Sequence, residues 1–152
     1  MNLPHPLPPL PRTATMADLS SLVQLEQEVF DYDQIGVSSF RKFIQSSYLW
    51  VFEQDEQIRA YILLLKRKGS KKLRIYSLAV SASSRGLGLG KKLLEYAISQ
   101  ASREGYQVLS LEVKIDNGPA IKLYENLGFT LLKKIEGFYS DGSTALVYQK
   151  TL

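Results

Sequence analysis

The stretch Arg85-Gly86-Leu87-Gly88-Leu89-Gly90 contains three alternating glycines and is followed by two lysines, Lys91 and Lys92. An apolar run over 75–80 precedes it, and apolar residues at helical spacing follow it as far as Ala101. This order predicts a strand, a glycine loop and a helix. Glycines let the backbone approach an anion, and the first N–H groups of a helix are free to bind one. The stretch therefore predicts a phosphate-binding loop.

Two common glycine motifs do not fit this loop. In the P-loop pattern G-x-x-x-x-G-K-[ST], the first glycine would fall on Arg85 and the hydroxyl residue on Lys92. In the dinucleotide pattern G-x-G-x-x-G, the third glycine would fall on Lys91 or Leu93. On the glycines alone, a flexible basic loop without a ligand remains the alternative.

Two motifs together resemble a known family. The pattern R-x-x-G-x-G, formed by Arg85, Gly88 and Gly90, resembles the acetyl-CoA pyrophosphate loop of the GCN5-related N-acetyltransferases, the GNAT family. The segment 111–129, LEVKIDNGPAIKLYENLGF, is similar to the second family signature, L-x-V-x-x-x-N-x-x-A-x-x-L-Y-x-x-x-G-F. The resemblance covers about residues 10–152, and in its motifs the chain is most similar to bacterial ribosomal-protein N-terminal alanine acetyltransferases.

Composition limits the chemistry. The chain has 152 residues, 45% of them hydrophobic, which suits one domain with a substantial core. It has no cysteine, and its one histidine is His5, so disulfides, thiolate sites and histidine-based catalysis or zinc binding are not expected. The net charge of +4 does not require a nucleic-acid partner. We see no membrane span or signal peptide and expect a cytoplasmic protein, monomeric or homodimeric.

The chain divides into a leader and one domain. Residues 1–11 hold five of the six prolines and predict a flexible leader, and residues 12–152 predict a single N-acetyltransferase domain. Strands are predicted over 12–15, 48–53, 57–66, 71–80, 107–113, 129–135 and 144–151. Helices are predicted from Asp18 as cap, from Ser38 or Ser39 as cap, from the glycine loop to Glu104, and from Asn117 as cap with Pro119 as first helical residue.

This order is β-α-α-β-β-β-α-β-α-β-β, an α/β (α+β) protein with a mixed sheet and helices on both faces. It is also the order that the resemblance implies. The GNAT fold further implies that the strand ending at Val80 splays from the strand 107–113, with the thioester of acetyl-CoA in the gap.

The resemblance assigns the donor side of the site. It implies acetyl-CoA as cosubstrate, without a metal. Pantetheine would pair with strand backbone, as an added strand does. Asn117 would orient pantetheine, cap its helix, or do both. The predicted acetyl-CoA residues are Leu78, Ala79, Val80, Arg85, Gly86, Leu87, Gly88, Leu89, Gly90, Lys91 and Asn117.

Two residues are predicted to be catalytic. On spacing alone Tyr124 is a core aromatic, but the resemblance implies that it donates a proton to the leaving thiolate, for which a phenol is suitable. Glu112 would be an ordinary solvated strand residue on its own. The resemblance implies that it is the general base, and it keeps the family spacing of twelve positions from Tyr124.

The acceptor side is less defined. The resemblance places it between the first two helices, the loop that joins them and the last hairpin. The predicted acceptor residues are Phe30, Tyr32, Asp33 and Tyr139, with Phe138 and Asp141 nearby. The segment 137–142, GFYSDG, resembles a Y-Y…D-G stretch of the ribosomal-type enzymes, with Phe138 in place of the first tyrosine.

The predicted function is transfer of an acetyl group from acetyl-CoA to a primary amine by direct attack. The acceptor is a protein or peptide N-terminal α-amine or, alternatively, a small-molecule amine such as a polyamine, an amino acid or an aminoglycoside. A non-catalytic acyl-CoA-binding module is the alternative of another class, but it would need neither Glu112 nor Tyr124.

Overall fold

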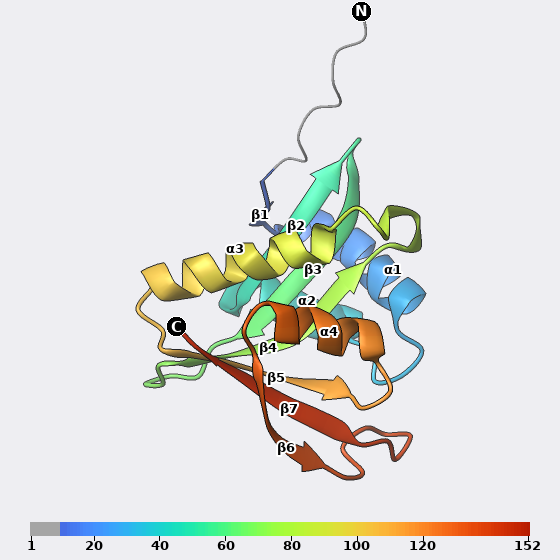
Figure 1. The fold of residues 1–152 in the computed structure, drawn as a ribbon. Helices are drawn as coiled ribbons and strands as arrows, with labels where there is room; N and C mark the ends of the chain where they lie inside the picture. The colour runs from blue at the N-terminus through green and yellow to red at the C-terminus, as the bar shows by residue number, and fades with distance from the viewer. Residues whose placement is uncertain (1–9) are drawn as a thin grey trace, which may run out of the picture.

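The computed structural model describes residues 10–152 as a seven-stranded mixed sheet in the order β1-β2-β3-β4-β5-β7-β6 (Figure 1). The strands are β1 (Arg12–Thr13), β2 (Tyr48–Gln54), β3 (Gln57–Leu65), β4 (Lys72–Val80), β5 (Val108–Lys114), β6 (Thr130–Ile135) and β7 (Ala145–Thr151). The helices are η1 (Met16–Asp18), α1 (Leu19–Val29), α2 (Val37–Ser46), η2 (Ala82–Ser84), α3 (Leu89–Arg103) and α4 (Gly118–Asn126). The predicted mixed sheet and its element order are confirmed.

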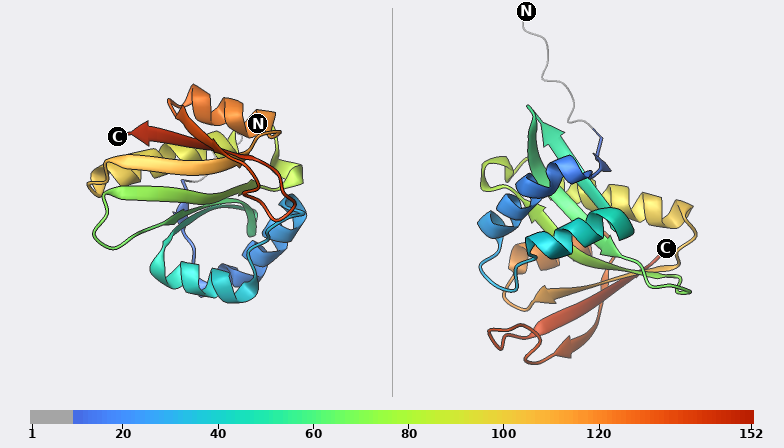
Figure 2. Two further views of the ribbon diagram at one scale, coloured as in Figure 1. Left: turned by 90° about the horizontal axis from the view of Figure 1, so that it is seen from below. Right: turned by 180° about the vertical axis from the view of Figure 1, so that it is seen from behind.

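Helices cover both faces of the sheet (Figure 2). On one face, α3 and α4 pack against the inward side chains of β2 to β5 and form a core. Leu93 and Leu94 of α3 and Leu111 of β5 lie in this core and are almost completely buried. On the other face, α1 and α2 enclose a second core around Leu22 and Phe40. Both faces of the sheet are therefore covered, each by its own core.

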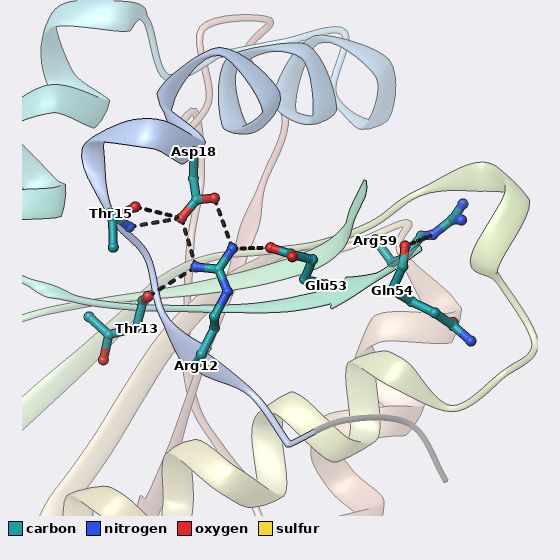
Figure 3. Close-up of polar contacts among 7 residues, drawn as sticks. All are labelled: Arg12, Thr13, Thr15, Asp18, Glu53, Gln54 and Arg59. Atoms are coloured by element: carbon teal, nitrogen blue, oxygen red, sulfur yellow. Dashed lines mark hydrogen bonds and ion pairs between the residues drawn. The ribbon is translucent and has the colours of Figure 1, made fainter. Parts of the chain in front are cut away.

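An ion-pair cluster fixes the start of the domain (Figure 3). Arg12 donates 2.9 Å hydrogen bonds to both carboxylate oxygens of Asp18 and also bonds to Glu53 on β2. The guanidinium of Arg12 lowers the pKa of Asp18, because it stabilises the ionised carboxylate. Most of the predicted leader lies outside the described residues, but its last residue, Pro11, is buried. The described chain is therefore already packed one residue before the predicted boundary.

Three helix starts differ from the predictions in detail. Asp18 does not cap α1 through its side chain; its carboxylate accepts the backbone N–H of Thr15 and the bonds from Arg12 instead. The second helix begins at Val37, and its cap is Gly36, two or three residues before the predicted cap, Ser38 or Ser39. Asn117 caps α4 as predicted, and Pro119 is the second helical residue rather than the first.

The parallel strands β4 and β5 separate partway along their length. They pair from Lys72 with Val108 to Ile75 with Leu111 and no further. A bulge in the β3–β4 ladder coincides with this point, because Leu63 pairs with Ser77 while Leu64 pairs with Ile75, which leaves Tyr76 as the extra residue. The predicted splay of the sheet is therefore present, and it exposes the unpaired edges of both strands.

Candidate active site

A cavity of about 280 Å³ opens where β4 and β5 separate. Its walls come from both sides of the sheet: α4 on one side, and the end of α1 with its following loop on the other. The β6–β7 loop completes the rim. Eight of the residues predicted from sequence line it: Phe30, Tyr32, Asp33, Leu78, Glu112, Asn117, Tyr124 and Tyr139. Predicted residues 100 positions apart in the chain are thus brought together in one place.

The free edge of β4 offers backbone groups to this gap. The N–H of Ser81 donates to the carbonyl of Arg59 on β3 over 2.8 Å. Along an antiparallel strand, the backbone N–H and C=O groups of every second residue point toward the same neighbouring strand. Ala79 therefore directs its backbone toward β3, whereas Leu78 and Val80 direct theirs into the gap. Of the three predicted residues, only Leu78 and Val80 can pair with a ligand there, and the Ala79 side chain is buried in the second core.

The glycine loop forms an anion cradle at the start of α3. Gly86 and Gly88 have positive φ angles of 83° and 75°, which glycine adopts without strain. Gly88 is the N-cap, and its carbonyl accepts the N–H of Lys92. The N–H groups of Leu89, Gly90 and Lys91 come before the first intrahelical bond and remain free. A phosphate therefore fits here on backbone donors.

The side chains around this cradle have different surroundings. Those of Arg85, Leu87 and Lys91 are exposed, whereas that of Leu89 is buried in the core and can contribute only its backbone N–H. At Gly90, an added Cβ would lie 3.5 Å from Val80 Cγ2 and 3.8 Å from Leu123 Cδ2. A side chain here would therefore lie against the end of β4 and against α4, at ordinary van der Waals distances. Together with the free β4 edge, the loop fits the pyrophosphate and pantetheine of acetyl-CoA.

Tyr124 reaches the cavity from α4. Its ring is 7% exposed and packs against Phe129 at a centroid distance of 5.7 Å. Burial raises the pKa of its hydroxyl well above the usual value of 10. Its hydroxyl has no hydrogen-bond partner within residues 10–152 and is not fully enclosed, so it is available to a bound molecule. The ring of Tyr124 therefore packs in the core, and its catalytic role stays a prediction.

Glu112 reaches the cavity from β5, on the face opposite the core residues Leu111 and Val113. Its carboxylate Oε2 accepts a 2.9 Å hydrogen bond from Nε of Arg74 on β4. The second carboxylate oxygen receives no hydrogen bond from any residue that the structure describes. Glu112 and Tyr124 thus approach one cavity from opposite faces of the sheet.

Asn117 has one demonstrated contact. Its Oδ1 accepts the backbone N–H of Ala120 over 3.3 Å and so caps α4. The residue also lines the cavity, and its amide nitrogen is not used by the cap. Capping and ligand contact are therefore compatible, as the sequence allowed.

The predicted acceptor residues form an aromatic wall. The rings of Phe30 and Tyr32 lie 6.1 Å apart, those of Tyr32 and Tyr139 5.4 Å, and those of Phe138 and Tyr139 5.0 Å, all edge to face. Burial raises the pKa of both Tyr32 and Tyr139, so both phenols stay protonated near neutral pH. Asp33 accepts the backbone N–H of Ser140 over 3.1 Å and joins the two loops that carry these rings.

Sequence reasoning missed three charged residues of the cavity. Arg74 pairs with Glu112, and Lys114 lies over the ring of Tyr32 and pairs with Asp141. Glu26 is 2% exposed and accepts the backbone N–H of Ile35 and the hydroxyl of Tyr61. Strand alternation could have placed Lys114 on the face of Glu112, but Arg74 and Glu26 depend on pairings between distant segments.

Within residues 10–152, no group of three or more histidine, aspartate or glutamate side chains is arranged to hold a metal ion. In the same part of the chain, no helix has both the length and the apolar character needed to cross a membrane.

Comparison with known proteins identifies the family. The model of the acetyltransferase (GNAT) family matches residues 16–129. An N-alpha-acetyltransferase of Sulfurisphaera tokodaii is 42% identical over 148 residues, which covers 88% of this chain and 87% of that protein.

Solved structures agree with this fold. The ribosomal-protein-S18-alanine N-acetyltransferase of Escherichia coli superposes with a TM-score of 0.84 at 23% identity, covering 93% of this chain and 92% of that one. A chain of the NatC complex bound to Gag peptide and CoA superposes with a TM-score of 0.80 at 22% identity, covering 94% and 98%. The chain therefore belongs to the acetyltransferase (GNAT) family and is an acetyl-CoA-dependent N-acetyltransferase.

Proposed function

We propose that this acetyltransferase acts on the N-terminal α-amine of a peptide or protein. The observation that supports this acceptor is the chemistry of the cavity wall. Tyr32, Tyr124 and Tyr139 bring three phenol hydroxyls to the cavity, and none has a hydrogen-bond partner within the described residues. Hydroxyls on rigid aromatic rings suit the carbonyl and amide groups of a peptide backbone, while the rings suit an uncharged side chain.

The carboxylates of the cavity argue against a polyamine or an aminoglycoside. Such polycations need several unpaired anions. Of the three carboxylates that line the cavity within the described chain, Glu112 is paired with Arg74 and Glu26 is buried, with two donors of its own. Only Asp33, which accepts the neutral N–H of Ser140, is left among them as an anion without a cationic partner. A single α-amine requires only one proton acceptor, so a cavity with few unpaired carboxylates favours a peptide N-terminus. The name of the Sulfurisphaera relative points in the same direction.

On the donor side, we assign the phosphates of acetyl-CoA to the backbone N–H groups at the start of α3, with Arg85 and Lys91 adding charge. Pantetheine would pair with Leu78 and Val80, and Asn117 would contact it from α4. These groups fix the thioester in the gap between β4 and β5. Such fixed positioning converts the reaction of two bound molecules into an effectively unimolecular step.

For the chemical step, Glu112 accepts a proton from the incoming ammonium, either directly or through water. This frees the nitrogen lone pair to attack the thioester carbon. As the carbon–sulfur bond breaks, the nitrogen loses its second proton to water, and CoA leaves as a thiolate. Tyr124 donates a hydrogen bond to the departing sulfur. A thiol has a pKa near 8.5, and the pKa of Tyr124 is raised, so full proton transfer from the phenol is uphill. We therefore assign Tyr124 mainly to stabilising the developing thiolate charge.

A screen of acceptors tests this proposal. Purified protein and acetyl-CoA are incubated with short peptides, the same peptides blocked at the N-terminus, spermidine, amino acids and aminoglycosides, and CoA release is measured. We expect turnover only with free N-terminal peptides. Preferred turnover of spermidine or an aminoglycoside would overturn the acceptor assignment. CoA binding without turnover of any amine would favour the non-catalytic module.

Cellular context remains a prediction as well. We propose a cytoplasmic monomer or homodimer with acetyl-CoA and the amine acceptor as its ligands, and a catalytic domain that includes the buried Pro11. Size-exclusion chromatography with light scattering measures the oligomeric state.

A further inference from the structure

Lys114 is a lysine with unusually little exposure for a residue at a cavity rim. Its side chain is 14% exposed, although it stands at the last position of β5. Strand alternation places it on the same face as Glu112, two residues earlier. A lysine usually keeps its ammonium in water. Here the ammonium also contacts protein groups, and all of them belong to the two loops that carry the acceptor aromatics.

The contacts of Lys114 reach two different loops. Its Nζ lies 3.8 Å from the ring centroid of Tyr32, in the α1–α2 loop, and 5.8 Å from that of Tyr139, in the β6–β7 loop. The same atom forms a 2.7 Å ion pair with Asp141 in the β6–β7 loop. Asp141 in turn accepts the backbone N–H and the hydroxyl of Ser143, which tightens that loop.

These contacts tie three segments together. The two loops touch each other through Asp33 with Ser140 and through the rings of Tyr32 and Tyr139, but neither contact connects them to the strand that bears Glu112. The backbone N–H of Ile115 donates to the carbonyl of Thr144 at the base of the β6–β7 loop, and Lys114 adds the side-chain connection from β5 to both loops. Because Lys114 and Glu112 are two residues apart on one strand, the lysine fixes how far the aromatic wall stands from the proposed base.

We propose that Lys114 is a positioning residue for the acceptor: its ammonium clamps the α1–α2 and β6–β7 loops to β5 and thereby preforms the peptide-binding wall. This inference rests on the proposed peptide acceptor. It extends that proposal, because the clamp takes no part in acetyl-CoA binding or in proton transfer. Preformation lowers the cost of ordering the loops when an acceptor binds.

If Lys114 only positions the acceptor, its loss should change the KM for the acceptor much more than the kcat. Lys114→Met keeps a long apolar side chain and removes the charge, so it loses both the cation–π contact and the ion pair. The KM for an acceptor peptide should rise about tenfold, within the usual range for the loss of such contacts. The kcat should change less than about threefold, and the Kd for acetyl-CoA, measured by calorimetry, should stay the same.

Three further variants sharpen the test. Lys114→Arg retains both the charge and the stacking and should restore most of the peptide affinity. Asp141→Asn should raise the KM on its own but add little to Lys114→Met, because both remove one interaction. Lys133→Met makes the same chemical change at an exposed position of β6 and should leave the KM unaltered.

The outcomes separate the two proposals. If the wild-type protein does not acetylate peptides, the proposed acceptor fails. If it does, but the KM of Lys114→Met is unchanged, or Lys114→Arg is as impaired as Lys114→Met, the clamp is refuted and the acceptor stands. A parallel loss of acetyl-CoA affinity would also refute the clamp. Asp141→Asn changes an exposed residue, so it provides the readout if Lys114→Met does not fold.

Discussion

Nε of Arg74 donates a 2.9 Å hydrogen bond to Oε2 of Glu112 across the last paired positions of β4 and β5. The arginine thereby holds the proposed base where the strands part. Only one carboxylate oxygen is engaged by the arginine, and the other is left to receive a proton. Arg74 also stacks near Tyr76, with its guanidinium carbon 5.3 Å from the ring centroid, which restricts its own side chain.

Arg74→Met should lower kcat by about tenfold, because a base that is not held in place spends less time in line with the acceptor amine. The Kd for acetyl-CoA should not change. Arg74→Lys, which keeps the charge but not the directed Nε–H, should give an intermediate kcat. Steady-state kinetics with a peptide acceptor measures both. Arg103→Met, at an exposed position near the end of α3, serves as the control. A kcat equal to that of wild type would mean that Glu112 does not need this partner.

Glu112→Gln should lower the rate most at neutral pH and recover as pH rises. A peptide α-amine has a pKa near 7.7–8.0, so free amine becomes abundant above about pH 8 and no longer needs a base. A lysine-like amine, with a pKa near 10.4, would recover only at much higher pH. Comparison of the pH–rate profiles of the two proteins therefore tests both the base and the kind of amine. Superimposable profiles would place the base elsewhere.

Tyr124→Phe should lower kcat by roughly a hundred- to a thousand-fold, because it removes one hydrogen bond to the developing charge on the sulfur. The substitution keeps the buried ring and its contact with Phe129, so acetyl-CoA affinity and the unfolding temperature should change little. A rapid-quench measurement ensures that chemistry, not product release, is observed. An unchanged chemical rate would leave Tyr124 only its packing role.

The sequence predicted those features that depend on local signals. The element order, the glycine loop before α3 and the Asn117 cap of α4 follow from glycine spacing, apolar periodicity and cap residues. The family resemblance added the gap between the strands. The start of α2 was predicted less well. Ser38 and Ser39 are good cap residues, but the chain uses Gly36 as the cap instead.

The partners of the site residues could not be read from the sequence. Arg74 is 38 positions from Glu112, and their contact requires the parallel register of β4 with β5. Likewise Lys114 and Tyr32 are far apart in the chain and meet only because two loops fold over one edge of the cavity. Residue types were informative about chemistry, but the geometry that pairs them is tertiary.

Gly90→Asp should weaken acetyl-CoA binding at least tenfold without unfolding the protein. Gly90 has no positive φ, and a Cβ there would make only ordinary van der Waals contact, so the backbone tolerates a side chain. The new carboxylate would repel the pyrophosphate at the start of α3. Ser38→Asp adds the same charge at the second residue of α2 and is the matched control. Calorimetry reports the Kd, and equal affinity in the two variants would remove the glycine loop from the phosphate site.

Glu26 is buried beneath the α1–α2 loop. Burial raises its pKa above the usual 4.5, although hydrogen bonds from Tyr61 and from the backbone of Ile35 favour the ionised form. The native state therefore binds this proton more tightly than the unfolded chain does. The stabilisation that results is complete below about pH 4.5 and is lost as pH rises through the folded-state pKa.

Glu26→Gln removes this titration while keeping the size of the side chain. An amide oxygen can still accept the N–H of Ile35, and Tyr61 can direct its hydroxyl to Ser77, which lies 2.9 Å away. The free energy of unfolding of the wild type, relative to that of Glu26→Gln, should therefore decrease between pH 4.5 and 8. Urea titrations at several pH values measure the difference. Glu95→Gln, at an exposed position of α3, should show no such trend, and a pH-independent difference for Glu26→Gln would mean that its carboxyl is not destabilised by burial.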